Sequence, residues 1–578
     1  MDIHKEKHFE AEVLKHLCGS GWVSSSDLVK GTPAHRGGTY DRDLALWPED
    51  VLSWIQLTQP KMWAKLKASK NGQSEAALLK RLAECCDKDG ALSVLRHGFK
   101  DVGLKFDMCQ FKPGHSMNPE TMERYGHVIL RVEQQVKYSV NKENGNCIDL
   151  VFFVNGIPVA TWELKTDFTQ TVEDAKWQYK VDRPPKDPTT NKEEPLLAFK
   201  RRSLVHFALS TDEAWMATKL AGKGTYFLPF NLGHEEGAGN PPNPKGYKTS
   251  YLWERVFARE ALLDIVGRFV HLEQEEVKDQ ETGKKIIKES MIFPRFHQWE
   301  AVCDLIEAAQ KEGAGNRYLI QHSAGSGKTN SISWLSHQLA SLHANNKKVF
   351  DSVIVITDRT VLDAQLQDAI YQFEHKQGVV RKIEDKPGAP PKSAQLAEAL
   401  SQNTPIIICT IQTFPFAMEA IVKDASAKGK SFAVIADEAH SSQTGGAAAK
   451  LKATLATDLS EVLSAERIKE LEDDEEAELS ADELMLIAMH GRARASNVSF
   501  FAFTATPKAK TLELFGRKPS AGEPAGEGNL PEPFHLYSMQ QAIEEGFILD
   551  VLKNYTPYKM AFKLAHKIGR ASCRERVC

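Results

Sequence analysis

The stretch CIDLVFFVNGIPVATWELKT, residues 147–166, has the pattern of two strands joined by a tight turn. β-Branched and aromatic residues dominate both halves, and the Asn155-Gly156 pair between them is the strongest short-range signal for a hairpin. Side chains alternate along a strand, so Glu163 and Lys165 share one face. Together with Asp149, they place three charges on a largely apolar hairpin, where burial is costly unless they pair or hold a metal.

The register of this hairpin decides whether its two acids can cooperate. A regular two-residue turn sets Asp149 opposite Trp162, with its carboxylate on the face away from Glu163. Pro158 cannot donate a ladder hydrogen bond and suits a β-bulge. We therefore predict an irregularity between residues 154 and 162, which returns the two acids to one face.

Composition indicates an ordinary soluble protein. The chain has 578 residues, of which 42% are hydrophobic and 26% charged, with a net charge of −4; the length suggests about four domains. A near-neutral average does not exclude nucleic acid, because a large protein can contain a basic groove. The nine cysteines show no CxxC or zinc spacing, which favours free thiols in a reducing cytosol. The charged start and the lack of long apolar runs predict a cytoplasmic protein without membrane contact.

The pattern of elements changes along the chain. Residues 1–130 are mostly helical, and residues 130–230 hold the hairpin and further strands. A Gly/Pro-rich loop (231–246) and a charged stretch (273–290) follow. From residue 291, short apolar strands alternate with helices, which predicts a parallel sheet wrapped by helices. The expected strands are RYLIQH, SVIVITD, PIIICTI, FAVIAD and VSFFAFTA.

The segment QHSAGSGKT (321–329) follows a strand and precedes a helical pattern, as a phosphate-binding loop requires. Lys328 supplies a charge for the β- and γ-phosphates of ATP, and Thr329 a hydroxyl for Mg²⁺. His322 replaces the first glycine of the usual pattern, so a chance Gly-rich turn is the alternative. The candidate ATP-binding residues of this loop are Ser323, Gly325, Ser326, Gly327, Lys328 and Thr329.

Two later strands also end in polar residues. FAVIADEAH ends in Asp437, a candidate Mg²⁺ ligand, and Glu438, a candidate for polarising the water that attacks ATP. The alternative is a pair of solvated loop acids. FTATP carries Thr504 and Thr506, whose hydroxyls are candidates for coupling nucleotide state to substrate.

These motifs, in this order, resemble the first motor domain of superfamily 2 helicases and translocases over about 291–515. FPRFHQWEAV (293–302) is similar to the adenine-reading segment, which implies a reading role for Gln298 with Phe296 or Arg295 nearby. VITDRTVLDAQL and CTIQTF resemble segments that grip the nucleic-acid backbone. Ordinary strand-to-helix loops are the alternative for the latter two.

A motor preceded by Asp149 and Glu163-x-Lys165 resembles the motor (R) subunit of type I restriction endonucleases, up to about residue 565. YDRDLALWPEDVLSWIQLTQPKMW, VNGIPVATWELK, TVEDAKWQY and DEAHSSQTG carry the likeness. The resemblance implies that Asp149 and Glu163 bind Mg²⁺, and that Lys165 orients water or neutralises developing charge.

Two further residues are implied by the same resemblance. Gln178 is expected on the next helix beside the metal site, although the tyrosine that often follows it in the family is Asp182 here. An acid of the first helix sometimes joins such sites, and Glu10 is the candidate. Without the family, Glu163 and Lys165 would be a surface ion pair, which stabilises little.

The expected fold is α/β, with a PD-(D/E)xK-type nuclease domain, then a RecA-like parallel-sheet motor domain, and no second motor domain. The expected boundaries are 1–260 for the nuclease domain (core 130–230), 261–290 for a connecting segment and 291–515 for the motor, with an acidic helical insert at 450–495. A linker is expected at 516–533, the start of a truncated second motor domain at 534–567, and a translated sequencing adapter at 568–578.

The resemblance implies ATP-dependent DNA translocation and Mg²⁺-dependent double-strand cleavage, as the restriction subunit of a type I restriction-modification system. Its partners would be double-stranded DNA and the methyltransferase and specificity subunits, and its cofactors ATP and Mg²⁺. A second motor domain supplies arginines for hydrolysis. We therefore expect the chain, as a fragment, not to turn over ATP alone, with residues 550–578 poorly ordered.

Two other functions remain open. In a type III-like restriction subunit the nuclease follows the motor, whereas here Asp149 to Lys165 precede it. The other is a non-nucleolytic remodeler or repair ATPase, whose N-terminal region only binds DNA. Replacing Asp149 with alanine tests the remodeler, because unchanged DNA cleavage by the reconstituted complex would favour it.

Overall fold

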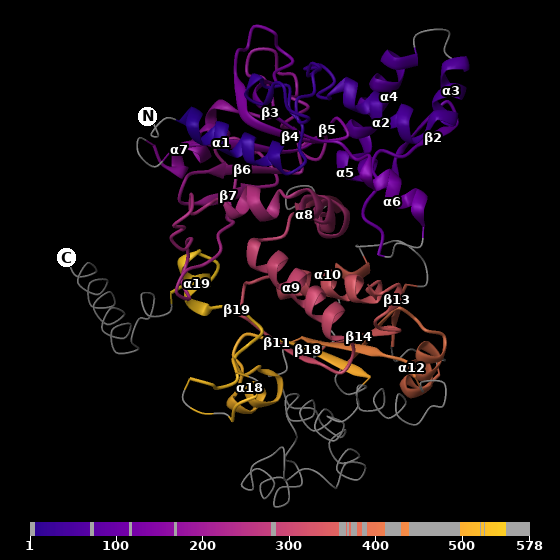
Figure 1. Ribbon diagram of the computed structural model, residues 1–578, viewed down its shortest axis with the longest axis vertical. Helices are drawn as coiled ribbons and strands as arrows, with labels where there is room; N and C mark the ends of the chain where they lie inside the picture. The colour runs from indigo at the N-terminus through magenta and orange to yellow at the C-terminus, as the bar shows by residue number, and fades with distance from the viewer. Residues whose placement is uncertain are drawn as a thin grey trace, which may run out of the picture.

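The structure is a computed structural model of the chain, organised around two sheets that lie one above the other (Figure 1). It describes residues 6–69, 74–114, 118–166, 170–278, 285–357, 379–383, 390–410, 429–437, 497–520 and 528–550, with a few single residues between these ranges. The predicted acidic insert at 450–495 and the closing residues 568–578 lie outside the described residues.

Helices precede the first sheet, as the sequence predicts for residues 1–130. They alternate apolar residues that are buried with polar residues that are exposed, which is the pattern of a helix packed on one face. Their bounds are α1 Glu6–Gly19, α2 Pro48–Thr58, α3 Pro60–Ser69, α4 Ser74–Asp89, α5 Ala91–His97 and α6 Pro119–Gly126, with a short hairpin of β1 Phe99–Asp101 and β2 Leu104–Phe106 before α6.

The first sheet is mixed, with the order β3-β4-β5-β6-β7-β8. Among the described strands of this sheet, β5 and β6 are the parallel pair, and the crossover between them contains α7 Val172–Trp177 and a π-helical turn, Gln178–Asp182. The strands are β3 Leu130–Lys137, β4 Cys147–Val154, β5 Ile157–Leu164, β6 Val205–Leu209, β7 Ala214–Ala217 and β8 Leu228–Pro229.

The predicted irregularity in the β4–β5 hairpin is confirmed. Phe153 pairs with Pro158, but Phe152 pairs with Ala160, so Val159 is an extra residue on β5. From there the ladder runs regularly to the pair of Leu150 and Trp162. Continuing this register by one residue sets Asp149 opposite Glu163, on one face of the sheet.

Buried side chains cover both faces of this sheet. Phe152, Trp162 and their neighbours belong to the larger core, whereas Val151, Phe153 and Tyr179 belong to a smaller one. The smaller core lies on the side of α7, which contributes Val172 and Ala175. Side chains on both faces of β4 and β5 are therefore removed from water, and the charges on these strands are buried with them.

The second sheet is parallel throughout, as the alternating pattern after residue 291 predicts. Its order is β15-β16-β14-β17-β18-β11-β19. The strands are β11 Arg317–His322, β14 Ser352–Thr357, β15 Val380–Lys382, β16 Ile406–Thr410, β17 Phe432–Asp437, β18 Val498–Thr504 and β19 His535–Tyr537; the helices are α9 Phe296–Glu312, α10 Lys328–Ala340, α12 Lys392–Ser401, α18 Ala509–Phe515 and α19 Met539–Glu544, and a small hairpin pairs β12 His343–Ala344 with β13 Lys347–Lys348.

The segment between the sheets is more ordered than a connecting segment at 261–290 implies. It contains π-helical turns at Leu252–Val256 and Ile265–Phe269, helix α8 Arg259–Asp264, and an antiparallel hairpin of β9 His271–Lys278 and β10 Lys285–Ile292. Charged residues are interspersed with Val and Ile along this hairpin, and these β-branched residues favour strands.

Aromatic rings connect the two halves of the molecule. Phe207 of the first sheet contacts Phe257 and Phe293, and Phe230 contacts Phe293 and Phe296 of α9. Figure 1 shows α8, α9 and α10 between the two sheets. The larger core therefore runs without a break from the first sheet to the second.

The expectation that 534–567 begins a second motor domain is wrong for the described part of that range. β19 is added parallel to β11 at the edge of the seven-stranded sheet. This short strand follows a Gly/Pro-rich stretch. Because that stretch is held to the sheet, the chain returns to the same domain. Arg517 in that stretch contacts the rings of Tyr318 and Phe534 and pairs with Glu312 at 2.7 Å.

A fully buried ion network fixes the start of β3. The guanidinium of Arg131 donates to Asp50 at 2.6 Å and to Glu133 at 2.6 Å, and it lies over the ring of Trp47. We expect Arg131→Met to lower the free energy of unfolding by about 3–5 kcal/mol, because Glu133 would remain buried without a cation and Asp50 would keep only its ion pair with the partly exposed Arg36. Chemical denaturation measures this change. The exposed Arg81→Ala is the control, and equal stability of Arg131→Met and the parent would contradict the expectation.

Candidate functional site

The first candidate site lies where three strands present polar side chains in one row. Gln135 of β3, Asp149 of β4 and Glu163 of β5 are successive cross-strand neighbours in the registers of the two ladders. Asp149 and Glu163 are buried. Asp149 accepts a hydrogen bond through Oδ2 from the backbone N–H of Leu164 at 2.8 Å, which fixes its carboxylate against β5.

Glu163 is not paired with Lys165, and the surface ion-pair interpretation is therefore wrong. Its side chain is fully buried, and Oε1 accepts a hydrogen bond from Nε of Arg183 at 2.8 Å. Oε2 is buried without a hydrogen bond among the described residues. Burial and the nearby charge of Asp149 raise the pKa of Glu163 well above its usual range, and Arg183 opposes this rise.

Lys165 contacts the first helix. Its Nζ donates to the backbone carbonyl of Leu164 at 2.8 Å and pairs with Glu6 of α1 at 3.2 Å. Burial raises the pKa of Glu6, while Lys165 lowers it. The buried ammonium group therefore lies at the end of β5, two residues beyond Glu163, as the predicted arrangement requires.

Glu10 of α1 joins the cluster, as the resemblance implies. It accepts hydrogen bonds from Nε2 of Gln134 at 3.0 Å and from Nε2 of Gln135 at 3.2 Å. Nε2 of Gln135 also donates to Asp149 at 3.1 Å, so one amide joins the two acids. Burial and the charge of Asp149 raise the pKa of Glu10 to about 7.

Three members of the cluster escaped sequence reasoning: Glu6, Gln135 and Arg183. They come from α1, β3 and the end of the π-helical turn, all outside the hairpin. No spacing pattern joins them to Asp149 and Glu163, since the cross-strand register and the crossover after β5 bring them together.

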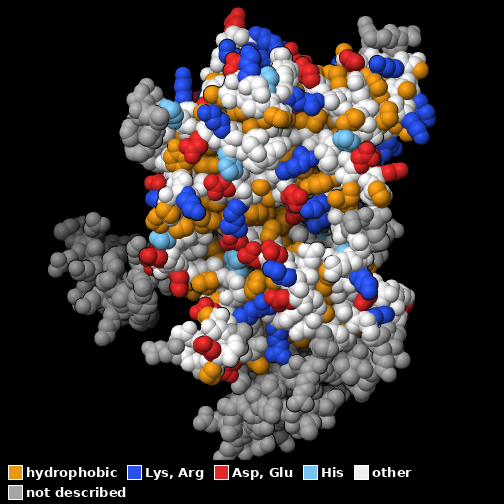
Figure 2. Space-filling view, in the orientation of Figure 1, with side chains coloured by type: hydrophobic (Ala, Val, Ile, Leu, Met, Phe, Trp, Pro, Cys, Tyr) orange, Lys and Arg blue, Asp and Glu red, His pale blue; other side chains and the backbone are white. Residues whose placement is uncertain are grey.

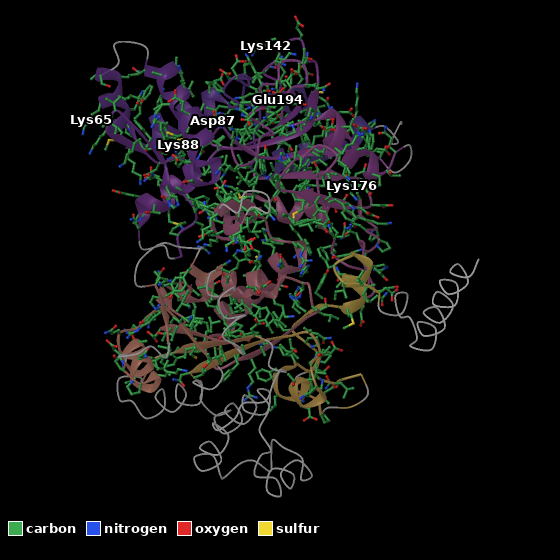
Figure 3. All side chains as sticks on the ribbon, turned by 180° about the vertical axis from the view of Figure 1, so that it is seen from behind. Lys65, Asp87, Lys88, Lys142, Lys176 and Glu194 are labelled. Carbon is green, nitrogen blue, oxygen red and sulfur yellow. The ribbon has the colours of Figure 1, made fainter. Side chains whose placement is uncertain are left out.

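Gln178 begins the π-helical turn after α7. Its Oε1 is buried and has no hydrogen bond among the described residues. Tyr179 beside it donates to or accepts from Thr161 at 2.8 Å, and Thr161 also bonds His206 at 2.7 Å. This buried network holds the turn on the sheet face that carries Glu163. Lys176 of α7, labelled in Figure 3, instead lies over the ring of Trp215 and pairs with Glu173.

The residues present fit a magnesium ion. No group of three or more His, Cys, Asp and Glu side chains is arranged to hold a metal within the described ranges. Mg²⁺, however, is usually held by one or two carboxylates, with water completing its octahedron. Asp149 and Glu163 provide two adjacent carboxylates, and Oε2 of Glu163 is a buried oxygen without a hydrogen bond from the part of the chain that the structure describes.

The raised pKa of Glu10 predicts a pH dependence of stability. A carboxyl with a raised pKa favours folding below its unfolded value, and this contribution is lost as pH rises through about 7. The free energy of unfolding of Glu10→Gln, relative to that of the parent, should therefore rise by up to about 3 kcal/mol between pH 4.5 and pH 8. Denaturant unfolding of both proteins across this range measures the difference. A difference that is constant with pH would contradict the assignment.

The second candidate site is the loop between β11 and α10. Gly325 and Gly327 have φ of 72° and 77°, the left-handed region in which glycine is unstrained. Gly327 caps the N-terminus of α10, and a Cβ on it would lie 2.4 Å from Nε2 of Gln298. The loop thus sets backbone N–H groups and Lys328 at a helix N-terminus, which is suited to binding phosphate. Nζ of Lys328 lies 3.2 Å from the carbonyl of His322.

His322 occupies the position of the first glycine in the usual phosphate-loop pattern. It is fully buried among His297, His535 and Tyr537, and Nε2 lies 2.9 Å from Nδ1 of His535. Burial lowers the pKa of His322 well below its usual range. The imidazole is therefore a neutral packing residue beneath the loop. The polar loop residues Ser323 and Ser326 are also buried, and Thr329 is half-buried on α10.

Gln298 contacts this loop directly. Its Nε2 donates to the carbonyls of Ser326 at 3.1 Å and Gly327 at 3.0 Å, and its Oε1 accepts from the backbone of Arg295 at 2.9 Å. Arg295 donates to the carbonyl of Gly325 at 2.8 Å and lies over the ring of Phe547. The predicted adenine-reading segment and the predicted phosphate loop are therefore one connected unit.

The remaining candidates lie at strand ends of the same sheet. Asp437 ends β17 and Thr504 ends β18, two neighbouring strands, and β18 is also adjacent to β11, which leads into the loop. Thr504 is buried and Thr506 exposed. Glu438 lies outside the described residues, as do most of the segments VITDRTVLDAQL and CTIQTF.

Charge is mixed over the surface that Figure 2 shows. Lys and Arg side chains are interspersed with Asp and Glu over both halves of this face. Among the helices that the structure describes, none combines the length and the apolar character needed to span a bilayer.

Comparisons with known proteins divide the chain in the same way as its motifs do. Residues 115–225 match the family described as type I restriction enzyme R protein N terminus, and residues 297–462 match the SWI2/SNF2 ATPase family. The fold is α/β, with a mixed sheet in the first region and a parallel sheet in the second.

Two curated relatives are similar to this chain. The type I restriction enzyme HindI endonuclease subunit of Haemophilus influenzae is 24% identical over 449 residues, covering 74% of this chain and 35% of the relative. A protein of Methanocaldococcus jannaschii described as a type I restriction enzyme MjaVIIIP endonuclease subunit is 26% identical over 288 residues, covering 47% and 24%. The resemblance to the R subunit of type I restriction enzymes is confirmed, and this chain spans about a third of the HindI subunit.

One solved structure is also similar. It is the fragment structure of a protein described as an HsdR subunit of a type I restriction enzyme from Vibrio vulnificus YJ016, at 15% identity, with 72% of this chain and 56% of that chain covered. Its TM-score is 0.24, which is too low to support any argument about the fold.

Proposed function

We propose that this chain provides the nuclease and the ATP-dependent motor of a type I restriction enzyme, as its restriction subunit. The observation that carries the proposal is the bulge at Val159, which sets Asp149 opposite Glu163 on the buried face of a sheet. Two adjacent carboxylates with a buried ammonium two residues further along are suited to metal-assisted phosphodiester cleavage. The same chain contains a glycine loop at the N-terminus of α10.

In the nuclease reaction, Asp149 and Glu163 would hold Mg²⁺, with Gln178 beside it. Bound there, the ion would supply a Lewis acid for the phosphodiester and lower the pKa of water. Lys165 is held by Glu6 and its own strand, and in this role its ammonium group would orient water or neutralise developing charge. Arg183 donates to one oxygen of Glu163, and the other oxygen would bind the ion.

In the motor, the loop 323–329 would bind the phosphates of ATP. Backbone N–H groups at the start of α10 and the ammonium of Lys328 favour anionic oxygens. Gln298 holds two carbonyls of the loop, and in the proposed role it links adenine recognition to the loop conformation. Thr329, Asp437 and Glu438 would complete the nucleotide site, and Thr504 and Thr506 would couple it to DNA.

The partners of the proposed enzyme are double-stranded DNA and the methyltransferase and specificity subunits of the complex. The support is the match of residues 115–225 to the R protein N terminus and the names of both curated relatives. Because sequence recognition would belong to another subunit, the nuclease would act only when the motor delivers DNA.

Reconstitution of this chain with the companion methyltransferase and specificity subunits, and with the second motor domain that the resemblance implies, tests the proposal. Double-stranded DNA should be cut only when both ATP and Mg²⁺ are present, because cleavage is proposed to depend on translocation. ATP turnover without any cleavage would favour the remodeler. Cleavage that does not depend on ATP would show that the nuclease acts without the motor.

A further inference from the structure

Gln135, which lies on β3 beside Asp149 in the first site, has a strained backbone. Gln135 has φ of 49°, although it lies within β3 and is neither glycine nor part of a turn. The pairs on either side, Gln134 with Leu150 and Val136 with Ile148, follow one register, in which Gln135 faces Asp149. Left-handed backbone is unfavourable for residues other than glycine and clusters at functional sites.

Both the nitrogen and the oxygen of the Gln135 amide form hydrogen bonds. Nε2 lies 3.1 Å from Oδ1 of Asp149 and 3.2 Å from Oε2 of Glu10, and it donates to both. Oε1 accepts from the thiol of Cys147 at 2.9 Å. The thiol defines which end of the amide faces the acids, because it offers a donor to the oxygen.

The amide of Gln135 lies between two acids that would otherwise repel each other. Glu10 and Asp149 come from α1 and β4, and their charges repel when both are ionised. A neutral amide that donates to both holds their oxygens near one another without neutralising them. Each carboxylate oxygen has further lone pairs, so a bond from Gln135 leaves room for a cation.

We propose that Gln135 is a positioning residue for the metal site, and that its left-handed backbone is retained because it aims the amide at Asp149 and Glu10. The inference rests on the proposed nuclease function. Partners that orient metal ligands through hydrogen bonds typically change metal affinity by about tenfold to a hundredfold when they are removed.

Gln135→Gly separates the positioning role from a merely structural one. Glycine relieves the backbone at this position and removes the amide. We expect the full-length variant to unfold at a temperature no lower than the parent, while its affinity for Mn²⁺ without nucleotide falls at least about tenfold. Electron paramagnetic resonance of free Mn²⁺ measures the affinity, and a thermal melt measures the stability.

Two further variants sharpen the test. Gln135→Asn tolerates the left-handed backbone and retains an amide that is one methylene shorter, so its Mn²⁺ affinity should fall between the other two. Val102→Gly is the matched control, because Val102 has φ of 48°, is 64% exposed and lies in the turn between β1 and β2. It should match the parent in Mn²⁺ affinity.

Asp149→Ala distinguishes failure of this inference from failure of the proposed function. Loss of Mn²⁺ affinity in Asp149→Ala together with unchanged affinity in Gln135→Gly would overturn the positioning role alone. Unchanged affinity in both would overturn the metal site itself. Tighter Mn²⁺ binding by Gln135→Gly would show that the amide competes with the ion, and it would also overturn the inference.

Discussion

Asp149→Ala should lower DNA cleavage by the reconstituted complex at least about a thousandfold, which corresponds to about 4 kcal/mol of transition-state stabilisation. The carboxylate lies beside Glu163 and is proposed to bind the metal, so its removal leaves one acid where two are needed. ATP-dependent movement along DNA should be retained, because the glycine loop belongs to the other sheet. Gel assays of plasmid cleavage and a triplex-displacement assay of translocation measure the two activities.

Asp149 also accepts a hydrogen bond from Leu164, so the alanine variant could lose activity through a shifted strand. Asp149→Asn retains an acceptor of the same size and lacks the charge, and we expect the same loss of cleavage. Asp43→Asn is the control, since Asp43 is exposed and pairs at 3.0 Å with Lys142, which is labelled in Figure 3. Undiminished cleavage by both Asp149 variants would rule out the nuclease assignment and favour a remodeler.

Lys328→Ala should weaken binding of a non-hydrolysable ATP analogue about a hundredfold. Hydrogen bonds to charged groups contribute about 1.5–3 kcal/mol each, and Lys328 is proposed to face two phosphates. Its Nζ lies 3.2 Å from the carbonyl of His322, a contact within the loop that phosphate binding would replace. Isothermal titration calorimetry of the full chain measures the affinity.

The lysine variant should unfold at the temperature of the parent, because its side chain is not part of either core. Lys347→Ala, on the exposed strand β13, serves as the control and should bind the analogue like the parent. An analogue affinity that does not change in Lys328→Ala would show that the loop does not bind phosphate.

The sequence predicted the fold well where hydrophobic pattern and turn chemistry agreed. Uniformly apolar strands after residue 291 can only be buried on both sides, and they form the parallel sheet. Asn155 and Pro158 were enough to predict a tight turn and a bulge, respectively. The end of the chain was misjudged, because a three-residue strand such as β19 has no periodicity to show which sheet it joins.

The candidate nuclease site was predictable only along the hairpin. Asp149, Glu163 and Lys165 lie within seventeen residues of one another in two paired strands, so alternation and register relate them. Gln135 and Arg183 belong to a third strand and to the crossover after β5, and they reach the acids through pairing and packing between separate elements. The π-helical turn that begins at Gln178 also has no sequence signature that separates it from an α-helix.

The bulge at Val159 also affects how relatives should be aligned. The β4–β5 hairpin contains one residue more than a regular hairpin needs to bring its two acids face to face. A homologue that lacks one residue between the turn and the second acid would retain the same facing pair simply by having no bulge. A single-residue gap in this hairpin is therefore no sign of a lost active site, and the number of residues between the acids should not serve as a criterion for membership. The facing pair itself, judged from the register, is the feature that homologues need to share.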